Sequence, residues 1–344
     1  GAPLPDAFQD SDTLLDADWT VIGSAEGDYL GQSVNSGDVN GDGLSDLLIG
    51  VRQGELPGGP YNTGTLQVYY GVDGGALSAT PDLQVAGEAG GNWFGAASAP
   101  LGDVDGDGLQ DIFVHSSRNH TYGYFAGMPY MVSNLEEGVA LAPLELPGEA
   151  AGQRFGYDVA VFERAGEEPT FDVGAPYHDT PTTYNEGAVF TFNKSNGEIV
   201  MNQLFGADAP KIGNNDRLGW SVAPVGDFNG DGHLDLAVSV HAEGKPASLD
   251  NKQICGASCP NSGTKNCTES LSYPGAVMIF AGQADGTFNT LPMFQYYSPE
   301  AKQTVRTVTA AGDVNGDGYQ DVLLASHIWD IPDVSNTGGF RLLL

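Results

Sequence analysis

Residues 38–46 read Asp-Val-Asn-Gly-Asp-Gly-Leu-Ser-Asp and lead directly into the apolar run Leu47-Leu48-Ile49. Acidic or amide side chains occupy positions 1, 3, 5 and 9 of this stretch, and glycines occupy positions 4 and 6. Oxygen ligands at alternate positions converge on one point, position 7 offers its backbone carbonyl, and the glycine at position 6 permits a sharp turn. The stretch therefore predicts a calcium-binding loop that leads into a β-strand.

The same pattern returns three times, at 103–111, 227–235 and 313–321, and each copy enters a similar apolar run. Four copies predict about four Ca²⁺ ions, and Mg²⁺ fits less well because it prefers a tighter octahedron that keeps its waters. Each ion could regulate ligand binding, or it could only stabilise a hairpin whose clustered carboxylates would otherwise repel one another. We expect the second, structural role. The predicted ligands, with position 7 giving its backbone oxygen, are Asp38, Asn40, Asp42, Leu44, Asp46, Asp103, Asp105, Asp107, Leu109, Asp111, Asp227, Asn229, Asp231, His233, Asp235, Asp313, Asn315, Asp317, Tyr319 and Asp321.

The composition is strongly acidic. Among 344 residues, 13 are Lys or Arg and 45 are Asp or Glu, and the formal net charge is −32. This balance argues against nucleic acid and anionic membrane surfaces as partners, because both call for basic patches. No apolar stretch approaches the ~18 residues that span a bilayer. The chain begins Gly1-Ala2-Pro3 without a signal peptide, which predicts a mature form or an excised fragment of a secreted or cell-surface protein.

All three cysteines, Cys255, Cys259 and Cys267, lie in one short segment. A structural zinc site needs four ligands, and no paired Cys-x2-Cys or His-x3-His partner accompanies them. We therefore expect one local disulfide and one remaining thiol, which would place the protein in an oxidising compartment.

A short motif precedes each acidic loop. Its glycines, Gly31, Gly95, Gly156 and Gly219, are spaced 64, 61 and 63 residues apart, and a fifth copy near Val305 lacks the glycine. Each repeat reads as four short strands with Gly, Pro and Asp at the junctions, and we find no convincing amphipathic helix. The second strands are predicted at 46–51, 112–115, 171–175, 236–240 and 322–325, and the third at 64–70, 122–125, 187–192, 275–280 and 339–343.

Four-stranded units repeating at about 60 residues predict an all-β fold, a β-propeller. Residues 17–23 resemble an unassigned fourth strand, and the last repeat stops after its third strand. We therefore expect five blades, with the N-terminal strand completing the last blade. The predicted organisation is an extension over 1–16 and one propeller over 17–344, with repeats starting near 30, 94, 155, 218 and 305 and a Cys-containing insertion at 241–274.

Phe-Gly, the acidic loop and Gly174-Ala175-Pro176 together resemble the FG-GAP repeat of the integrin α-subunit propeller, over roughly residues 17–344. The resemblance implies calcium on the face opposite the ligand-binding face, and a role in adhesion or recognition. Two features depart from it. Integrin propellers have seven blades, whereas five are counted here, and the third repeat carries residues 163–168 in place of its acidic loop.

The connections between second and third strands should emerge opposite the calcium loops, because neighbouring strands alternate in direction. They vary in length, and long loops on a rigid scaffold are where binding usually resides. The alternative is that they only cap the ring. The candidate ligand-binding residues for a protein or glycan partner are Arg52, Tyr61, Tyr177, Tyr184, His241, Tyr273, His327 and Trp329.

No catalytic motif accompanies the six histidines, and most clustered carboxylates are already assigned to calcium. We therefore expect a non-enzymatic protein for adhesion or partner recognition. Two alternatives remain open from the sequence: a polysaccharide-directed lectin or lyase-like protein, and an architectural module of a larger surface protein.

Overall fold

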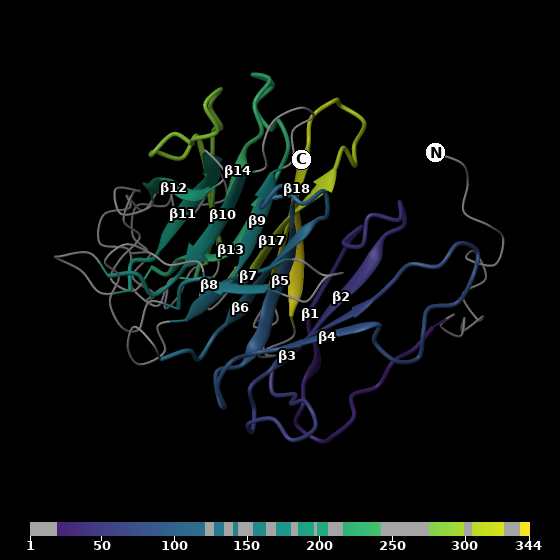
Figure 1. The fold of residues 1–344 in the computed structure, drawn as a ribbon. Coiled ribbons are helices and arrows are strands. Elements are labelled where there is room, and N and C mark those ends of the chain that lie inside the picture. Colours follow the sequence, from purple (N-terminus) through teal and green to yellow (C-terminus); the bar gives the residue numbers. More distant parts are fainter. Residues whose placement is uncertain are drawn as a thin grey trace, which may run out of the picture.

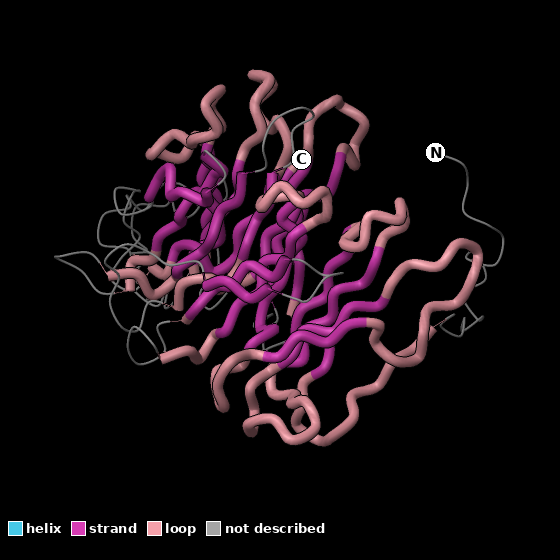
Figure 2. The backbone as a smooth tube through the Cα atoms, in the orientation of Figure 1, coloured by secondary structure: helices cyan, strands magenta, loops and turns pink. Residues whose placement is uncertain are grey.

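The computed structural model describes residues 19–120, 127–133, 140–143, 154–162, 170–179, 185–195, 198–205, 216–241, 275–298, 305–326 and 338–344. These residues form strands and loops, and the strands fan out in successive sheets (Figures 1 and 2). In this part of the chain, no helix has the length and apolar character that a membrane span requires.

The described strands form five antiparallel sheets in chain order, four of four strands and one of three. Within each sheet, successive strands are neighbours. The strands are β1 (Leu30–Gly37), β2 (Asp46–Val51), β3 (Thr65–Tyr69), β4 (Leu83–Ala86), β5 (Phe94–Gly102), β6 (Asp111–Ser116), β7 (Met128–Ser133), β8 (Ala140–Pro143), β9 (Val159–Phe162), β10 (Thr170–Ala175), β11 (Ala188–Ser195), β12 (Glu198–Phe205), β13 (Leu218–Pro224), β14 (Leu236–Val240), β15 (Ala276–Phe280), β16 (Phe294–Tyr297), β17 (Thr307–Gly312), β18 (Asp321–Ser326) and β19 (Gly339–Leu343).

Four hydrophobic clusters join successive sheets. Leu48, Leu66 and Ile112 belong to the cluster between the first and second sheets. Phe113 and Phe190 belong to the cluster between the second and third. Equivalent clusters join the third sheet to the fourth and the fourth to the fifth. Each sheet therefore buries its faces against its neighbours in the chain, which is consistent with propeller blades.

The Leu218-Gly219 pair, which stands where other repeats have Phe-Gly, meets the Gly-Ala-Pro motif of the preceding repeat where neighbouring blades touch. Gly219 has φ +89°, and a Cβ built on Gly174 would lie 2.2 Å from the Gly219 carbonyl oxygen. Gly187, at the start of the third strand, forms a parallel bridge with Leu218 of the next blade. These glycines permit backbone of adjacent blades to approach more closely than any side chain allows.

The predicted second strands are confirmed, but one third strand is not. In the second repeat it lies at Met128–Ser133 and pairs with β6, with Ile112 opposite Val132. We predicted 122–125, which falls outside the described residues. The run from Met128 to Val132 is almost entirely buried. It therefore supplies the buried face of the third strand, which we had assigned to 122–125.

The prediction that an N-terminal strand closes the last blade is also wrong for the residues that the structure describes. Residues 19–23 form no strand, and the fifth sheet has three strands in the described part of the chain. The Trp19 indole packs edge-to-face on Tyr69 at 5.1 Å and donates a hydrogen bond to the Ser78 carbonyl at 3.1 Å. The Tyr69 ring and the Ser78 carbonyl thus hold Trp19 on the first sheet.

Candidate functional site

The acidic loops connect the first and second strands of four sheets, and all four share one pattern of hydrogen bonds. In the first, Asp38 Oδ2 accepts the Gly43 N–H at 2.9 Å, and Asp42 Oδ1 accepts the Leu44 N–H at 2.8 Å. The same pairs recur from Gly108 to Asp103, from Gly232 to Asp227 and from Gly318 to Asp313, at 2.9 to 3.0 Å. The repeated spacing therefore gives a repeated fold of the backbone.

The aspartate at position 9 is buried in every loop: Asp46, Asp111, Asp235 and Asp321 are at most 2% exposed. Asp235 Oδ2 accepts the N–H of Phe228 at 2.9 Å, and its Oδ1 accepts that of Gly282 at 2.9 Å. Asp46 makes the matching bonds from Val39 and Gly71. In the first and third acidic loops, position 9 thus fastens the loop to the segment that follows the third strand, in addition to any contact with an ion.

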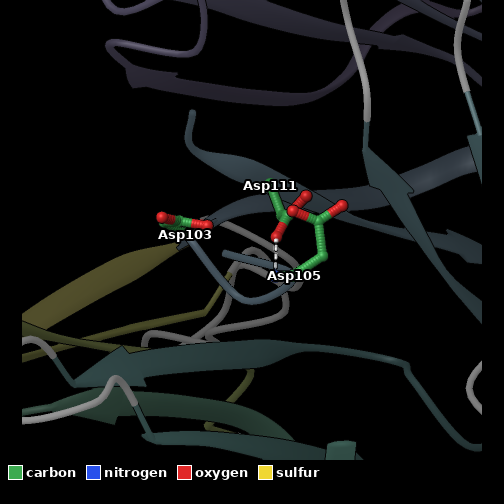
Figure 3. Close-up of side chains that lie close together, drawn as sticks. All are labelled: Asp103, Asp105 and Asp111. Atoms are coloured by element: carbon green, nitrogen blue, oxygen red, sulfur yellow. Dashed lines mark hydrogen bonds between the residues drawn. The ribbon is translucent and has the colours of Figure 1, made fainter. Parts of the chain in front are cut away.

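The geometry fits a hard cation. One carboxylate oxygen each from Asp103, Asp105 and Asp111 lie within 4.8 Å of one another (Figure 3). In the first and fourth loops, the Oδ1 atoms of Asp38 and Asp321 are buried without a hydrogen-bond partner among the described residues. Buried carboxylate oxygens of this kind are costly unless a cation or donor meets them. The oxygen-only donor set matches the ligand preference of Ca²⁺.

The pKa values follow from this crowding. Burial, with smaller contributions from the charges of Asp105 and Asp107, raises the pKa of Asp111 to about 6, although backbone N–H donors oppose the rise. Burial also raises the pKa values of Asp46 and Asp235. A cation would favour the ionised carboxylates, so its binding is coupled to proton release.

The side chain at position 7 has a structural place that sequence reasoning missed. A Cβ on Gly41 would lie 3.0 Å from Leu109 Cδ2, and one on Gly230 would lie 3.2 Å from Tyr319 Cε1. In these two pairs of loops, the position-7 side chain of the later loop therefore rests on the position-4 glycine of the earlier loop. The signal is that position 4 is glycine, with positive φ, in all four loops.

A substitution at position 9 separates the hydrogen-bonding role from the metal. We expect Asp235→Asn to lower the free energy of unfolding by about 2 to 4 kcal/mol even with a chelator present, because the amide nitrogen would face a backbone N–H donor. Chemical denaturation measures this change. Asp73→Asn, at an exposed position outside the loops, removes the same charge and should change stability by less than about 0.5 kcal/mol. Equal effects of the two substitutions would contradict this role.

The candidate ligand-binding residues fall into three groups. Arg52, Tyr177 and His241 follow second strands at the end of the blades opposite the acidic loops, and His241 stacks on Trp220 at 4.5 Å. Tyr61 lies on the same connection as Arg52 and is 76% exposed. Tyr184, Tyr273, His327 and Trp329 lie outside the described residues, as do the three cysteines, residues 163–168 and the rest of the 241–274 insertion.

A cavity of about 400 Å³ lies where the five innermost strands meet. Ser33 of β1, Ser98 of β5, Asp158 just before β9, Ser221 of β13 and Thr307 of β17 all line it. Residues of the first and fifth sheets thus line one cavity. Asp158 Oδ2 accepts the N–H of Val222 at 3.0 Å, and burial raises the pKa of Asp158 to about 6. Sequence reasoning did not select Asp158.

The described histidines form no catalytic grouping that we can identify. His115 is fully buried, and burial lowers its pKa to about 3, so it stays neutral at physiological pH. The His178 ring, also buried, packs edge-to-face on Phe190 at 5.5 Å. His178 therefore packs within its own sheet, whereas His115 lies against the next repeat, where a Cβ on Gly156 would lie 2.6 Å from its Cδ2.

Comparison with known proteins identifies the repeats. The FG-GAP repeat model matches residues 218–253 and 305–340, and the FG-GAP-like repeat model matches residues 38–114. Integrin alpha pat-2 of Caenorhabditis briggsae is 27% identical over 283 residues, covering 76% of this chain and 22% of the relative. Integrin alpha-4 of Xenopus laevis is 29% identical over 140 residues, covering 41% of this chain and 13% of the relative.

The chain thus spans about a fifth or less of these relatives. Among solved structures, the rhamnogalacturonan lyase PL11 of Bacillus licheniformis matches with a TM-score of 0.41 and 16% identity, covering 85% of this chain and 54% of that chain.

Proposed function

Because this chain is built on FG-GAP repeats and is similar to integrin α subunits, we propose that it is an extracellular, calcium-stabilised propeller that recognises a partner without catalysing a reaction. The observation that carries this proposal is the fourfold recurrence of one acidic loop at one end of the blades. Four similar sites at equivalent junctions are explained more simply by a structural role in the scaffold than by binding of one ligand.

In the proposed arrangement, positions 1, 3, 5 and 9 and the carbonyl of position 7 hold one Ca²⁺ in each loop. The ion supplies positive charge that offsets carboxylate repulsion and locks the turn between the first two strands. In the first loop, Asp38 would use its unpartnered Oδ1, while Asp46 keeps the loop on the hairpin after β3.

The binding surface would then be the end of the blades opposite these loops, where Arg52, Tyr61, Tyr177 and His241 lie. Aromatic and arginine side chains on a rigid scaffold are the residue types that dominate protein interfaces. Five blades, closure of the ring and a disulfide among Cys255, Cys259 and Cys267 complete the proposed molecule. Its partner is a protein or a glycan outside the cell.

A capture experiment tests which face binds. The calcium-loaded protein is immobilised and exposed to extracellular material from its source, and the retained component is identified. We expect the double substitution Arg52→Ala and Tyr61→Ala to reduce retention about tenfold, as removing interface anchors does.

The matched control is the double substitution Val314→Ala and Tyr319→Ala in the fourth acidic loop, where both side chains are more than half exposed. It should leave retention unchanged. Loss of retention only in this second variant would place binding on the loop face and overturn the proposal. Turnover of a polysaccharide by the wild-type protein would favour the carbohydrate-active alternative instead.

A further inference from the structure

Arginines gather on aromatic rings at the end of the blades opposite the acidic loops. In the first two sheets, the Arg52 guanidinium lies 4.5 Å from the Tyr29 ring centre and 4.4 Å from that of Trp93. Arg118 lies 4.0 Å from the centre of the Trp93 ring. Tyr29, Arg52, Trp93 and Arg118 thus form one continuous stack, which we name the first ladder.

A second ladder continues over the third, fourth and fifth sheets. Arg154 lies 4.3 Å and Arg217 lies 4.7 Å from the Tyr177 ring centre. Arg217 is 6.0 Å and Arg306 is 5.1 Å from that of Trp220. Five of the seven arginines in a chain of net charge −32 therefore share this end of the molecule.

The ladders follow from the repeat. Tyr29, Trp93, Arg154 and Arg217 each directly precede the Phe-Gly or Leu-Gly pair, and their φ angles are +57°, +59°, +49° and +51°. Non-glycine residues rarely adopt such angles. The same corner of the backbone thus presents an aromatic or arginine side chain in four blades, and the ladder members that follow second strands stack against it.

The guanidinium groups are held in place by the rings, and those of Arg52 and Arg306 keep hydrogen-bonding capacity. All five arginines are only half-buried, and the Nε atoms of Arg52 and Arg306 are buried without a hydrogen bond among the described residues. Stacking on an aromatic ring leaves the in-plane N–H donors of arginine available, and fixing the side chain lowers the entropy lost on binding. A carboxylate accepts two such N–H groups side by side.

The surroundings favour carboxylates over sugar rings. Two guanidinium groups lie over Trp93, and two lie over Tyr177, so these rings offer less free surface for stacking on a sugar. Trp220 and Arg306 also line the axial cavity beside Asp158, whose oxygens accept the N–H groups of Val159 and Val222. Backbone donors therefore engage the Asp158 carboxylate, which lines the same cavity as Trp220 and Arg306.

We propose that the two ladders bind a protein segment rich in aspartate or glutamate. Elsewhere the acidic surface of this chain repels such a segment, so the arginine end gives both the attraction and the orientation of docking. This inference rests on the proposed function, because it names the partner chemistry of the same face.

The test uses fluorescein-labelled hexaglutamate as the probe and fluorescence anisotropy of the full calcium-loaded protein. We expect hexaglutamate to bind, and Arg154→Gln or Arg306→Gln to weaken binding at least about tenfold, as loss of a charged hydrogen-bonding partner does. Arg306→Lys keeps the charge but not the fork of donors, and should weaken binding by a smaller factor at an unchanged melting temperature.

Arg341→Gln is the matched control. Arg341 lies in β19, donates to the Tyr296 hydroxyl and belongs to neither ladder, so the substitution changes net charge equally and should leave binding intact. An equal loss with Arg341→Gln, or no binding of hexaglutamate to the wild type, overturns the proposal. Binding of oligogalacturonate without hexaglutamate also overturns it, because the ladders would then serve an acidic polysaccharide.

Different results would contradict the proposed function and the proposed ligand chemistry. If hexaglutamate does not bind while partner capture still depends on Arg52 and Tyr61, the proposed function stands and the ligand chemistry is wrong. If capture depends instead on Val314 and Tyr319, the proposed function itself fails.

Discussion

Chelation of divalent cations should lower the melting temperature of this protein by on the order of 10 °C or more. A bound ligand present at 100 times its Kd stabilises the folded state by about 2.7 kcal/mol, and four acidic loops offer four such contributions. A change of 1 kcal/mol shifts the melting temperature of a domain of this size by about 2 °C. Buried oxygens such as Asp38 Oδ1 would lose their partner at the same time.

Differential scanning calorimetry with and without EDTA measures this effect. Added Ca²⁺ should restore the melting temperature, and Mg²⁺ should restore less of it, because a loop of carboxylates and carbonyls suits a larger and more flexible coordination shell. The fall in melting temperature should shrink by about a quarter in an Asp42→Asn and Asp38→Asn variant, which disables one loop. An unchanged melting temperature in EDTA would mean that the loops hold no structural ion.

Gly187→Ala should be among the most destabilising single substitutions, at about 3 kcal/mol or more. Gly187 has φ +80°, and a Cβ there would lie 2.1 Å from the Leu218 carbonyl oxygen of the next blade. The conformational cost is about 1 to 2 kcal/mol for a residue with a side chain. Because the clash is with backbone in a bridge between blades, relieving it must shift the blades themselves, which adds about 1 to 3 kcal/mol.

Gly91→Ala separates the two contributions. Gly91 has φ +79°, and a Cβ there would meet nothing within 4 Å. This variant should lose only the conformational part, about 1 to 2 kcal/mol, in chemical denaturation of the calcium-loaded protein. Similar losses in the two variants would show that the contact between Gly187 and Leu218 does not limit how closely the blades pack.

Much of the fold was predictable because the same sequence pattern recurs in successive repeats. The second strands follow the acidic loops at a fixed distance, and their buried apolar runs, such as Leu236 to Val240, admit little ambiguity. The roles of Gly174 and Gly219 were visible as motifs, but the contact between them requires two blades in space. Sequence spacing alone does not show which backbone atoms approach.

Two predictions failed for physical reasons. The third strand of the second repeat was placed at 122–125, although the run at Met128–Ser133 carries the buried face. The N-terminal segment was assigned to the last blade by counting strands, whereas Trp19 is held on the first sheet by Tyr69 and Ser78. Counting assumes that every segment pairs, and one large aromatic side chain is enough to direct a segment elsewhere.

The end of the blades where the arginines gather was the part of the fold that the sequence predicted least. Arg52, Tyr177 and His241 were selected because they follow second strands, but Arg118, Arg154, Arg217 and Arg306 were not. Their positions become meaningful only when adjacent blades bring arginines onto Trp93, Tyr177 and Trp220. A contact between blades has no fixed spacing along the chain, because the connections differ in length from repeat to repeat.

The central claim is that four equivalent acidic loops hold structural calcium. Isothermal titration calorimetry of the decalcified protein with Ca²⁺ tests it most directly, provided that the protein stays folded at the chosen temperature. The account predicts about four ions bound per chain, and about one fewer when Asp38 and Asp42 are both replaced by Asn. Absence of calcium binding, or a stoichiometry that this double substitution leaves unchanged, would contradict the account.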